Sequence, residues 1–157
     1  MIVAVTTQSQ AGRVVSPARI KRAATKMLKV LVLPKAELSI LLCTDFEIHA
    51  LNKTFRHKNK PTDVLAFALR EGEAGHLAGD ALGDIVISVE TAKRQSVEHN
   101  VSLKTESFSL LAHGLLHLLG WDHRTDKEDK NMRAETARLV ECALRGDIKR
   151  PLRRATK

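Results

Sequence analysis

Aromatic side chains are scarce in this sequence of 157 residues: there are four Phe, one Trp and no Tyr. RNA-binding modules that stack bases on a sheet need several exposed aromatics, so this class is disfavoured. No stretch approaches the roughly 18 apolar residues of a membrane helix. The first five residues are too short for a signal-peptide core, and no basic segment precedes them. With two cysteines, Cys43 and Cys142, a disulfide-stapled secreted fold is also disfavoured, which predicts a reduced, cytoplasmic protein.

The size and composition indicate one globular domain. The mass is 17.4 kDa, 43% of the residues are hydrophobic and 28% are charged, so the chain can bury a core and is not disordered as a whole. We expect a single domain over residues 1–148. Residues 149–157 are basic, lack apolar periodicity and are expected to form a mobile tail.

Positive charge is concentrated at the two ends of the chain. Residues 1–36 carry seven basic side chains and no acidic one, residues 37–144 have a net charge of −4, and residues 145–157 have +5. This distribution suggests a polyanionic partner such as nucleic acid. A solvated helix face with a frayed tail explains it equally well, and a transit peptide is a third, less favoured interpretation.

Apolar patterning predicts strands at residues 3–7, 38–43, 64–69 and 84–89. Helices are expected after the capping residues Ser16, Thr44, Ser102 and Thr125, the first of them closed by Pro34, and a weaker one over residues 90–99. The glycine-rich residues 71–83 are expected to form a loop. The fold class is therefore α+β, with a small mixed sheet and about five helices.

The most informative segment is residues 113–123, which read HGLLHLLGWDH. His113 and His117 are four residues apart, so on a helix both rings project from the same face. Gly120 allows a sharp turn that brings His123 back toward them. Three neutral imidazoles around one ion, with a fourth position open, are typical of a catalytic zinc site. The other four histidines, His49, His57, His76 and His99, lack this spacing and are interpreted as surface residues.

The same spacing occurs in metzincin peptidases, with one difference. Those enzymes have a Glu directly after the first His as the general base, whereas this chain has Gly114. Losing a general base typically costs 10²–10⁴-fold in rate, so peptide hydrolysis is disfavoured. Phosphodiester chemistry remains open, because it can use the metal together with nearby cations.

The segment 113–123 resembles the signature of the YbeY endoribonucleases, a family of bacterial and organellar rRNA maturation factors. Two further blocks agree with that family: residues 52–56 leading to PTDVLAF at 61–67, and LGDIVIS at 82–88. The resemblance covers about residues 38–140, so both basic ends lie outside it. The chain departs from the family at Ala66 and Ala68, where Ser and Pro are usual; this leaves the metal ligands untouched.

The resemblance implies a zincin-like fold, one Zn²⁺ held by His113, His117 and His123, and cleavage of single-stranded RNA. It also implies maturation of the 16S rRNA 3′ end, ribosome quality control and a small-subunit partner. The functional arginine of the family matches Arg56, which joins His113 and His117 as a catalytic candidate.

The residues themselves leave some roles open. Arg56 can hold a phosphate in a bidentate manner or pair with an acid. Asp122 is a candidate partner for an imidazole N–H of a metal ligand. Structural roles are favoured for Asp63 and Asp84, and packing over the site for Trp121. The leading hypothesis is a cytoplasmic zinc-dependent endoribonuclease; a metallopeptidase, or a non-catalytic ribosome assembly factor with structural zinc, are the alternatives.

Overall fold

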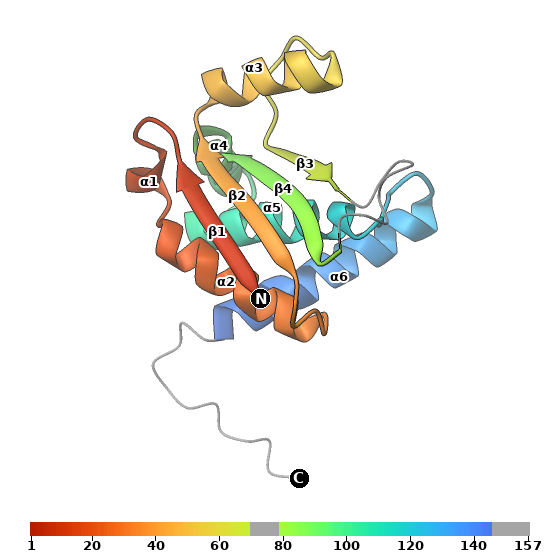
Figure 1. Ribbon diagram of the computed structural model, residues 1–157. Coiled ribbons are helices and arrows are strands. Elements are labelled where there is room, and N and C mark those ends of the chain that lie inside the picture. Colours follow the sequence, from red (N-terminus) through yellow and green to blue (C-terminus); the bar gives the residue numbers. More distant parts are fainter. Residues whose placement is uncertain (70–78, 146–157) are drawn as a thin grey trace.

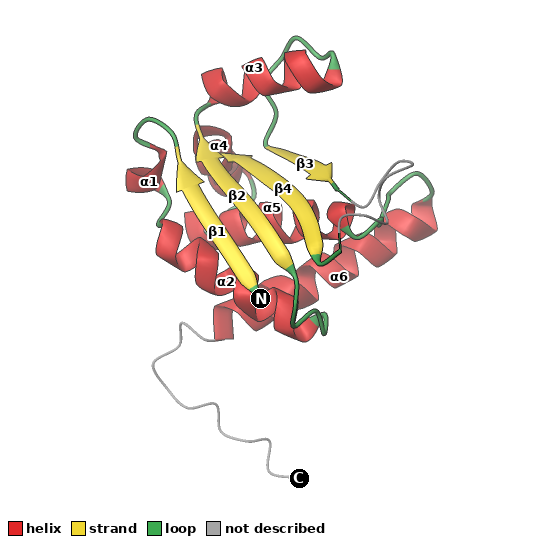
Figure 2. Ribbon diagram, viewed as in Figure 1, coloured by secondary structure: helices red, strands yellow, loops and turns green. Residues whose placement is uncertain are grey.

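The computed structural model describes residues 1–69 and 79–145, which form a four-stranded sheet with helices around it (Figures 1 and 2). The sheet has the order β1-β2-β4-β3. Strands β1, β2 and β4 run parallel, and β3 pairs antiparallel with β4 at one edge. The predicted mixed sheet is thus confirmed. The strand bounds are β1 Ile2–Thr7, β2 Glu37–Cys43, β3 Val64–Ala68 and β4 Ala81–Ser88.

Six helices lie in the described residues, one more than the sequence suggested. The additional helix has only four residues and no side-chain cap, so it leaves little trace in the sequence pattern. The helices are α1 Ala11–Val14, α2 Pro17–Val30, α3 Asp45–Arg56, α4 Val89–Glu98, α5 Leu103–Leu118 and α6 Asp126–Arg145.

Local capping chemistry accounts for where most helices begin. The side chains of Ser16, Ser88 and Ser102 each accept a hydrogen bond from the first turn of the helix that follows. The predicted capping box of α3 is present: Thr44 accepts from the Glu47 N–H, and the Glu47 carboxylate accepts from the Thr44 N–H.

The two faces of the sheet are covered unequally. Helices α2 and α5 pack on one face, with α6 against both of them (Figure 1). Alternate strand residues such as Ile40, Leu42, Ile85 and Ile87 point into this main core. Helix α3 covers part of the other face through a small cluster of Cys43, Ile48, Leu65 and Val86. The sheet edge at β3 and the end of α5 therefore lie close together, and α5 contacts β3 directly.

Two predicted boundaries were wrong. Helix α2 ends at Val30 rather than near Pro34, because Val32 takes a left-handed φ of 58°. Strand β4 begins at Ala81, inside the segment expected to be a loop. Gly83 has φ 139° there, and an added Cβ would lie 2.1 Å from the Phe67 carbonyl oxygen. Gly83 thus allows the close approach of β3 to β4, next to a register shift between β2 and β4, and does not mark a loop.

The remaining expectations for chain segments concern residues outside the described part. These are residues 71–78 of the expected loop and the basic tail at 149–157. Among the described helices, none combines the length and the apolar character needed to cross a membrane.

Candidate metal centre

Helix α5 places the first two histidines of the motif side by side. His113 and His117 lie one turn apart near its C-terminal end, with ring centroids 4.5 Å apart. Their Nε2 atoms face each other at 3.0 Å. Both rings are half-buried, so part of each is enclosed by protein and part remains open.

The end of α5 turns the chain back toward these two rings. Gly120 has φ 91°, the left-handed conformation that favours glycine. The N–H of Gly120 donates to the His117 carbonyl, and the N–H of Trp121 donates to the Leu116 carbonyl. This pair of bonds is the Schellman arrangement, which satisfies the last carbonyls of the helix. The turn expected from the sequence is therefore present.

His123 completes a group of three imidazoles. Its ring centroid lies 5.9 Å from that of His113 and 5.5 Å from that of His117. One nitrogen from each ring can be chosen so that all three lie within 4.8 Å of one another. Nitrogens at 2.0–2.1 Å from a shared ion lie no more than about 4 Å apart. His123 is the exposed member of the three, so its side chain is the one with room to adjust to this distance.

A backbone contact orients the His117 ring. Its Nδ1 lies 3.1 Å from the Trp121 carbonyl oxygen, which can only accept, so Nδ1 carries the proton. That leaves the lone pair of Nε2 directed at the space shared with His113. This is the arrangement that metal-binding histidines usually have, with the far nitrogen held by a carbonyl. Trp121 thus acts through its backbone, which a sequence cannot reveal.

The electrostatic environment favours neutral imidazoles. Burial lowers the pKa of His113, and the neighbouring His117 lowers it further. Burial is also the largest cause that lowers the pKa of His117, and the charges of His123 and Arg56 lower it further. Neutral rings are the form that binds metal. The donor set, its spacing and its protonation therefore fit a transition-metal ion such as zinc.

Gly114 is buried where α5 presses on the sheet. An added Cβ would lie 2.9 Å from Ile85 Cγ2 and 3.3 Å from Val64 Cγ2. Even one carbon atom is crowded there, so a glutamate side chain has no space in this packing. The fold therefore leaves no room at position 114 for the glutamate that acts as the catalytic base in metzincins.

Arg56 lies at the last turn of α3, beside the β3 edge. Its Nη2 donates to the Ala66 carbonyl oxygen, and its guanidinium carbon lies 5.1 Å from the centre of the Phe67 ring. The side chain is exposed, and its charge is close enough to contribute to the lowered pKa of His117. Backbone and aromatic contacts therefore hold Arg56 near the histidine cluster.

The two acidic candidates, Asp122 and Asp63, each accept a hydrogen bond from a backbone N–H. Asp122 accepts from the His123 N–H at 2.7 Å and pairs with Arg124 at 2.7 Å. Among the described residues, its hydrogen bonds reach no imidazole, so it acts on the His123 backbone. Asp63 accepts from the Val64 N–H at 2.7 Å, at the start of β3.

The other described histidines and Asp84, for which surface or structural roles were expected, are not part of the histidine cluster. His49 contacts Asn59 at 2.8 Å, and His99 contacts the buried Glu106 at 2.9 Å. His57 caps α3 in the left-handed conformation. Asp84 is exposed on the face opposite the main core, and His76 lies outside the described residues.

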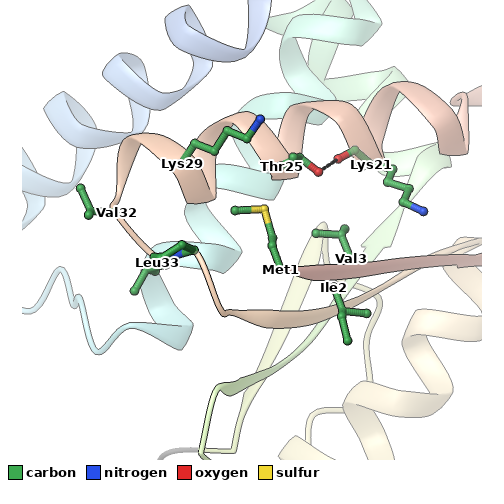
Figure 3. Close-up of a pocket in the computed structure, with 9 residues that line it drawn as sticks. Met1, Ile2, Val3, Lys21, Thr25, Lys29, Val32 and Leu33 are labelled. Carbon is green, nitrogen blue, oxygen red and sulfur yellow. Dashed lines mark hydrogen bonds between the residues drawn. The ribbon is translucent and has the colours of Figure 1, made fainter.

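A mostly apolar hollow with two lysines in its lining lies at the opposite edge of the sheet, between the start of β1 and α2 (Figure 3). Met1 extends into the space between the strand and the helix, and Lys21 and Lys29 lie on the α2 side. Both lysines are exposed and belong to the acid-free segment 1–36. None of the predicted site residues lines this hollow, so the N-terminal charge is separate from the histidine cluster.

Known proteins resemble this chain in sequence and in fold. The profile of the family described as endoribonuclease YbeY matches residues 5–143, a longer span than the motifs indicated. Proteins named endoribonuclease YbeY from Syntrophotalea carbinolica and Bacillus pumilus are 39% and 41% identical to it. These alignments cover 76% and 68% of this chain and 81% and 72% of the relatives. The protein of that name from a Picosynechococcus species is 56% identical over 91 residues, 55% of this chain and 56% of its own length.

The fold comparison agrees. The solution structure of a Thermotoga maritima protein matches 99% of this chain and all of its own, with a TM-score of 0.66 and 23% identity. At that identity the similarity concerns the fold alone. The family profile, by contrast, spans nearly the whole described chain and includes the histidine cluster. On this ground the chain belongs to the endoribonuclease YbeY family.

Proposed function

We propose that this chain is a zinc-dependent endoribonuclease that cleaves single-stranded rRNA precursors in the cytoplasm. Within that role we place maturation of the 16S rRNA 3′ end and ribosome quality control, with the small subunit as partner. Family membership supports RNA cleavage, since the relatives carry the name endoribonuclease. We assign this activity to a single domain over residues 1–148; residues 149–157 lie outside the described part of the chain.

One observation carries the proposal: three imidazole nitrogens converge within 4.8 Å beside an exposed arginine. His113, His117 and His123 would hold one zinc ion per chain. The same nitrogen donors also suit other transition metals, so the choice of zinc rests on the three-histidine pattern. When bound, the ion supplies Lewis-acid chemistry at a phosphate oxygen.

The residues of the chain then have distinct tasks. His113 and His117 present neutral nitrogens from a rigid helix, and the Trp121 carbonyl keeps His117 in the required tautomer. Arg56 donates hydrogen bonds to the phosphate and stabilises the negative charge that develops during cleavage. Its planar, permanently charged head suits this task better than an ammonium group does.

The two alternative functions have less support. Peptide hydrolysis lacks its general base, and the packing around Gly114 leaves no space for one. A purely structural zinc site is usually closed by four protein ligands. Within residues 1–69 and 79–145, the cluster has only the three histidines.

Metal content and RNA cleavage, measured on the same preparations, test the proposal. Wild-type protein should contain about one zinc per chain and cleave single-stranded RNA, and a chelator should abolish cleavage. His117→Ala should lose most of the metal and the activity. His49→Gln is the matched control, because His49 lies outside the cluster and should leave both unchanged.

Two results would contradict the proposal. Full metal occupancy in His117→Ala would exclude the assigned ligands. Chelator-sensitive cleavage of an unstructured peptide by the zinc-loaded protein, without RNA cleavage, would favour the peptidase alternative.

A further inference from the structure

A groove runs between α5 and α6 and opens beside His113. Its volume is about 650 Å³, and we call it the α5–α6 groove. Its lining includes His113 and Asp63, together with Gln95, Ser109 and Thr136. None of the roles assigned above uses the groove, apart from the position of His113 at its mouth.

The groove has the size and the mixed apolar and polar lining of a small-molecule site. Its volume falls in the range of about 300–1,000 Å³ that is usual for small-molecule sites. Leu110, Met132 and Val140, with 6%, 2% and 9% of their surface exposed, contribute apolar surface. Gln95, Ser109 and Thr136 add hydrogen-bonding groups that are half-buried. A few polar groups on an apolar surface give orientation and selectivity.

The charge of the groove lining determines which part of an RNA strand can bind there. Acidic side chains outnumber basic ones in the lining, and three of the acidic ones are in ion pairs: Asp129 with Arg133 at 2.9 Å, Glu106 with His99 at 2.9 Å, and Glu141 with Arg145. The lining therefore disfavours phosphate groups, and its carboxylate oxygens can accept hydrogen bonds from amines. The acidic residues are Asp63, Glu106, Asp129 and Glu141.

The charge around the histidine cluster is also asymmetric. Asp63 and Asp129 act on His113, and on the His117 side the cation Arg56 acts together with Asp122, a carboxylate that is paired with Arg124. An RNA backbone therefore finds its favourable side near Arg56. The uncharged base of an adjoining nucleotide is the part that can enter on the His113 side.

We propose that the α5–α6 groove binds a nucleobase of the RNA strand next to the phosphate that is cleaved. This inference rests on the proposed function and names the part of the substrate that the neighbouring surface selects. Bases with an exocyclic amine, such as adenine and cytosine, are preferred over uracil, because the walls are rich in acceptors. The groove then contributes to the choice of cleavage site.

Two alanines on α6 provide a matched pair of variants. Ala134 and Ala137 are both exposed on α6, but only Ala137 lines the groove. Ala137→Trp places a bulky ring in the groove, and Ala134→Trp places the same ring outside it. Thr136→Leu is a milder second variant that narrows the groove and removes a hydroxyl.

The experiment distinguishes the contribution of the bases to RNA binding from that of the phosphates. Binding of fluorescein-labelled oligoribonucleotides of adenine, cytosine or uracil is compared with binding of an abasic strand of equal length. Probe integrity is checked by gel electrophoresis after each titration. Wild type and Ala134→Trp should bind the adenine and cytosine strands about tenfold more tightly than the abasic strand, with uracil between them. Ala137→Trp and Thr136→Leu should lose this preference while metal content and circular dichroism stay unchanged.

Each outcome has a defined meaning. An equal preference in wild type and both groove variants overturns the groove assignment. Tight binding of a lysine-rich peptide that Ala137→Trp alone abolishes, without base preference in RNA, would identify a protein partner instead. Base preference without any RNA cleavage would support the groove and refute the proposed function, so the two failures can be distinguished.

Discussion

His117 shows how a single residue depends on its neighbours. The Trp121 carbonyl accepts from one ring nitrogen, so the other is left unprotonated and faces His113 at 3.0 Å. The motif in the sequence predicts which residues are ligands, but this choice of nitrogen depends on a backbone atom. The partner expected from the sequence was the side chain of Asp122, which contacts the His123 backbone instead.

Replacing Arg56 tests its role at the phosphate. Arg56→Ala should reduce RNA cleavage by about 10²–10³-fold, the usual cost of losing one donor to a developing negative charge. Metal content should stay normal, since the side chain is exposed and lies outside the ligand set. Arg56→Lys should restore little activity, because an ammonium group lacks the planar fork.

Lys53→Ala is the control for this substitution, since it removes an exposed cation from the same helix. Steady-state cleavage and zinc content of all three variants provide the measurement. Wild-type activity in Arg56→Ala would show that another group contacts the phosphate.

Cys43 gives a test of burial at the residue scale. Burial raises the pKa of this thiol to about 12, and the carboxylates of Glu47, Asp45 and Glu90 add to the effect. At pH 8 almost none of it is thiolate, the reactive form. Cys142 is only half-buried. In the native protein, a thiol reagent should therefore modify Cys142 and leave Cys43 untouched.

Counting modified thiols with a chromogenic disulfide reagent checks this expectation. Unfolding in urea should expose the second thiol, and Cys142→Ser should leave no reactive thiol in the native state. Rapid labelling of native Cys142→Ser at pH 8 would contradict the burial argument.

At the scale of the element, α5 and the turn after it contain two glycines that are needed for different reasons. Gly114 allows the helix to approach the sheet, where an added Cβ would lie 2.9 Å from Ile85. Gly120 has open space around its Cβ position, but its φ of 91° disfavours other residues. The first glycine sets the depth of His113 and His117, and the second directs the chain toward His123.

Substitution of Gly120 separates backbone strain from packing. Gly120→Ala should lower the free energy of unfolding of the metal-free protein by about 1–2 kcal/mol, the cost of a left-handed conformation. Gly120→Asn should cost less, because Asn tolerates this conformation. Zinc affinity should fall in the same order, since the turn positions His123. Urea unfolding and zinc titration provide the measurements, and equal losses in the two variants would refute this account of the turn.

At the scale of the whole molecule, the two sheet edges differ in character. The β3 edge lies beside the histidine cluster and Arg56, while the β1 edge lies beside α2 and its exposed lysines. The family profile begins at residue 5, so most of the acid-free N-terminal segment belongs to the matched domain. Its exposed lysines therefore lie on the folded surface, and we expect them to contact RNA phosphates.

Charge reversal on α2 tests whether these lysines contact RNA. Lys21→Glu with Lys29→Glu should weaken the binding of all single-stranded RNAs alike, because interactions with phosphates carry no sequence information. The slope of log affinity against log salt should flatten by about 0.7 for each phosphate that the protein no longer neutralises. Lys93→Glu with Lys130→Glu makes the same change in net charge at exposed positions on α4 and α6. Equal effects of the two double variants would mean that only net charge matters.

Much of this protein could be predicted from local sequence patterns. The spacing of His113 and His117 on a helix, the turn at Gly120 and the caps at Ser16, Thr44 and Ser102 depend on residues a few positions apart. Such features follow from helix periodicity and from backbone preferences of individual residues, and the structure contains all of them. The α+β class follows from the same periodicities.

Contacts between distant segments were decided only by the tertiary structure. The approach of β3 to Gly83 made the last three residues of an expected loop part of β4, because the glycine makes room for a backbone that is distant in sequence. The positions of Arg56 and of the α5–α6 groove depend on how helices pack around the β3 edge. The sequence alone determined which residues can bind a metal, since the ligands lie within eleven positions of each other. Which charges surround that site depends on packing between segments that no local pattern encodes.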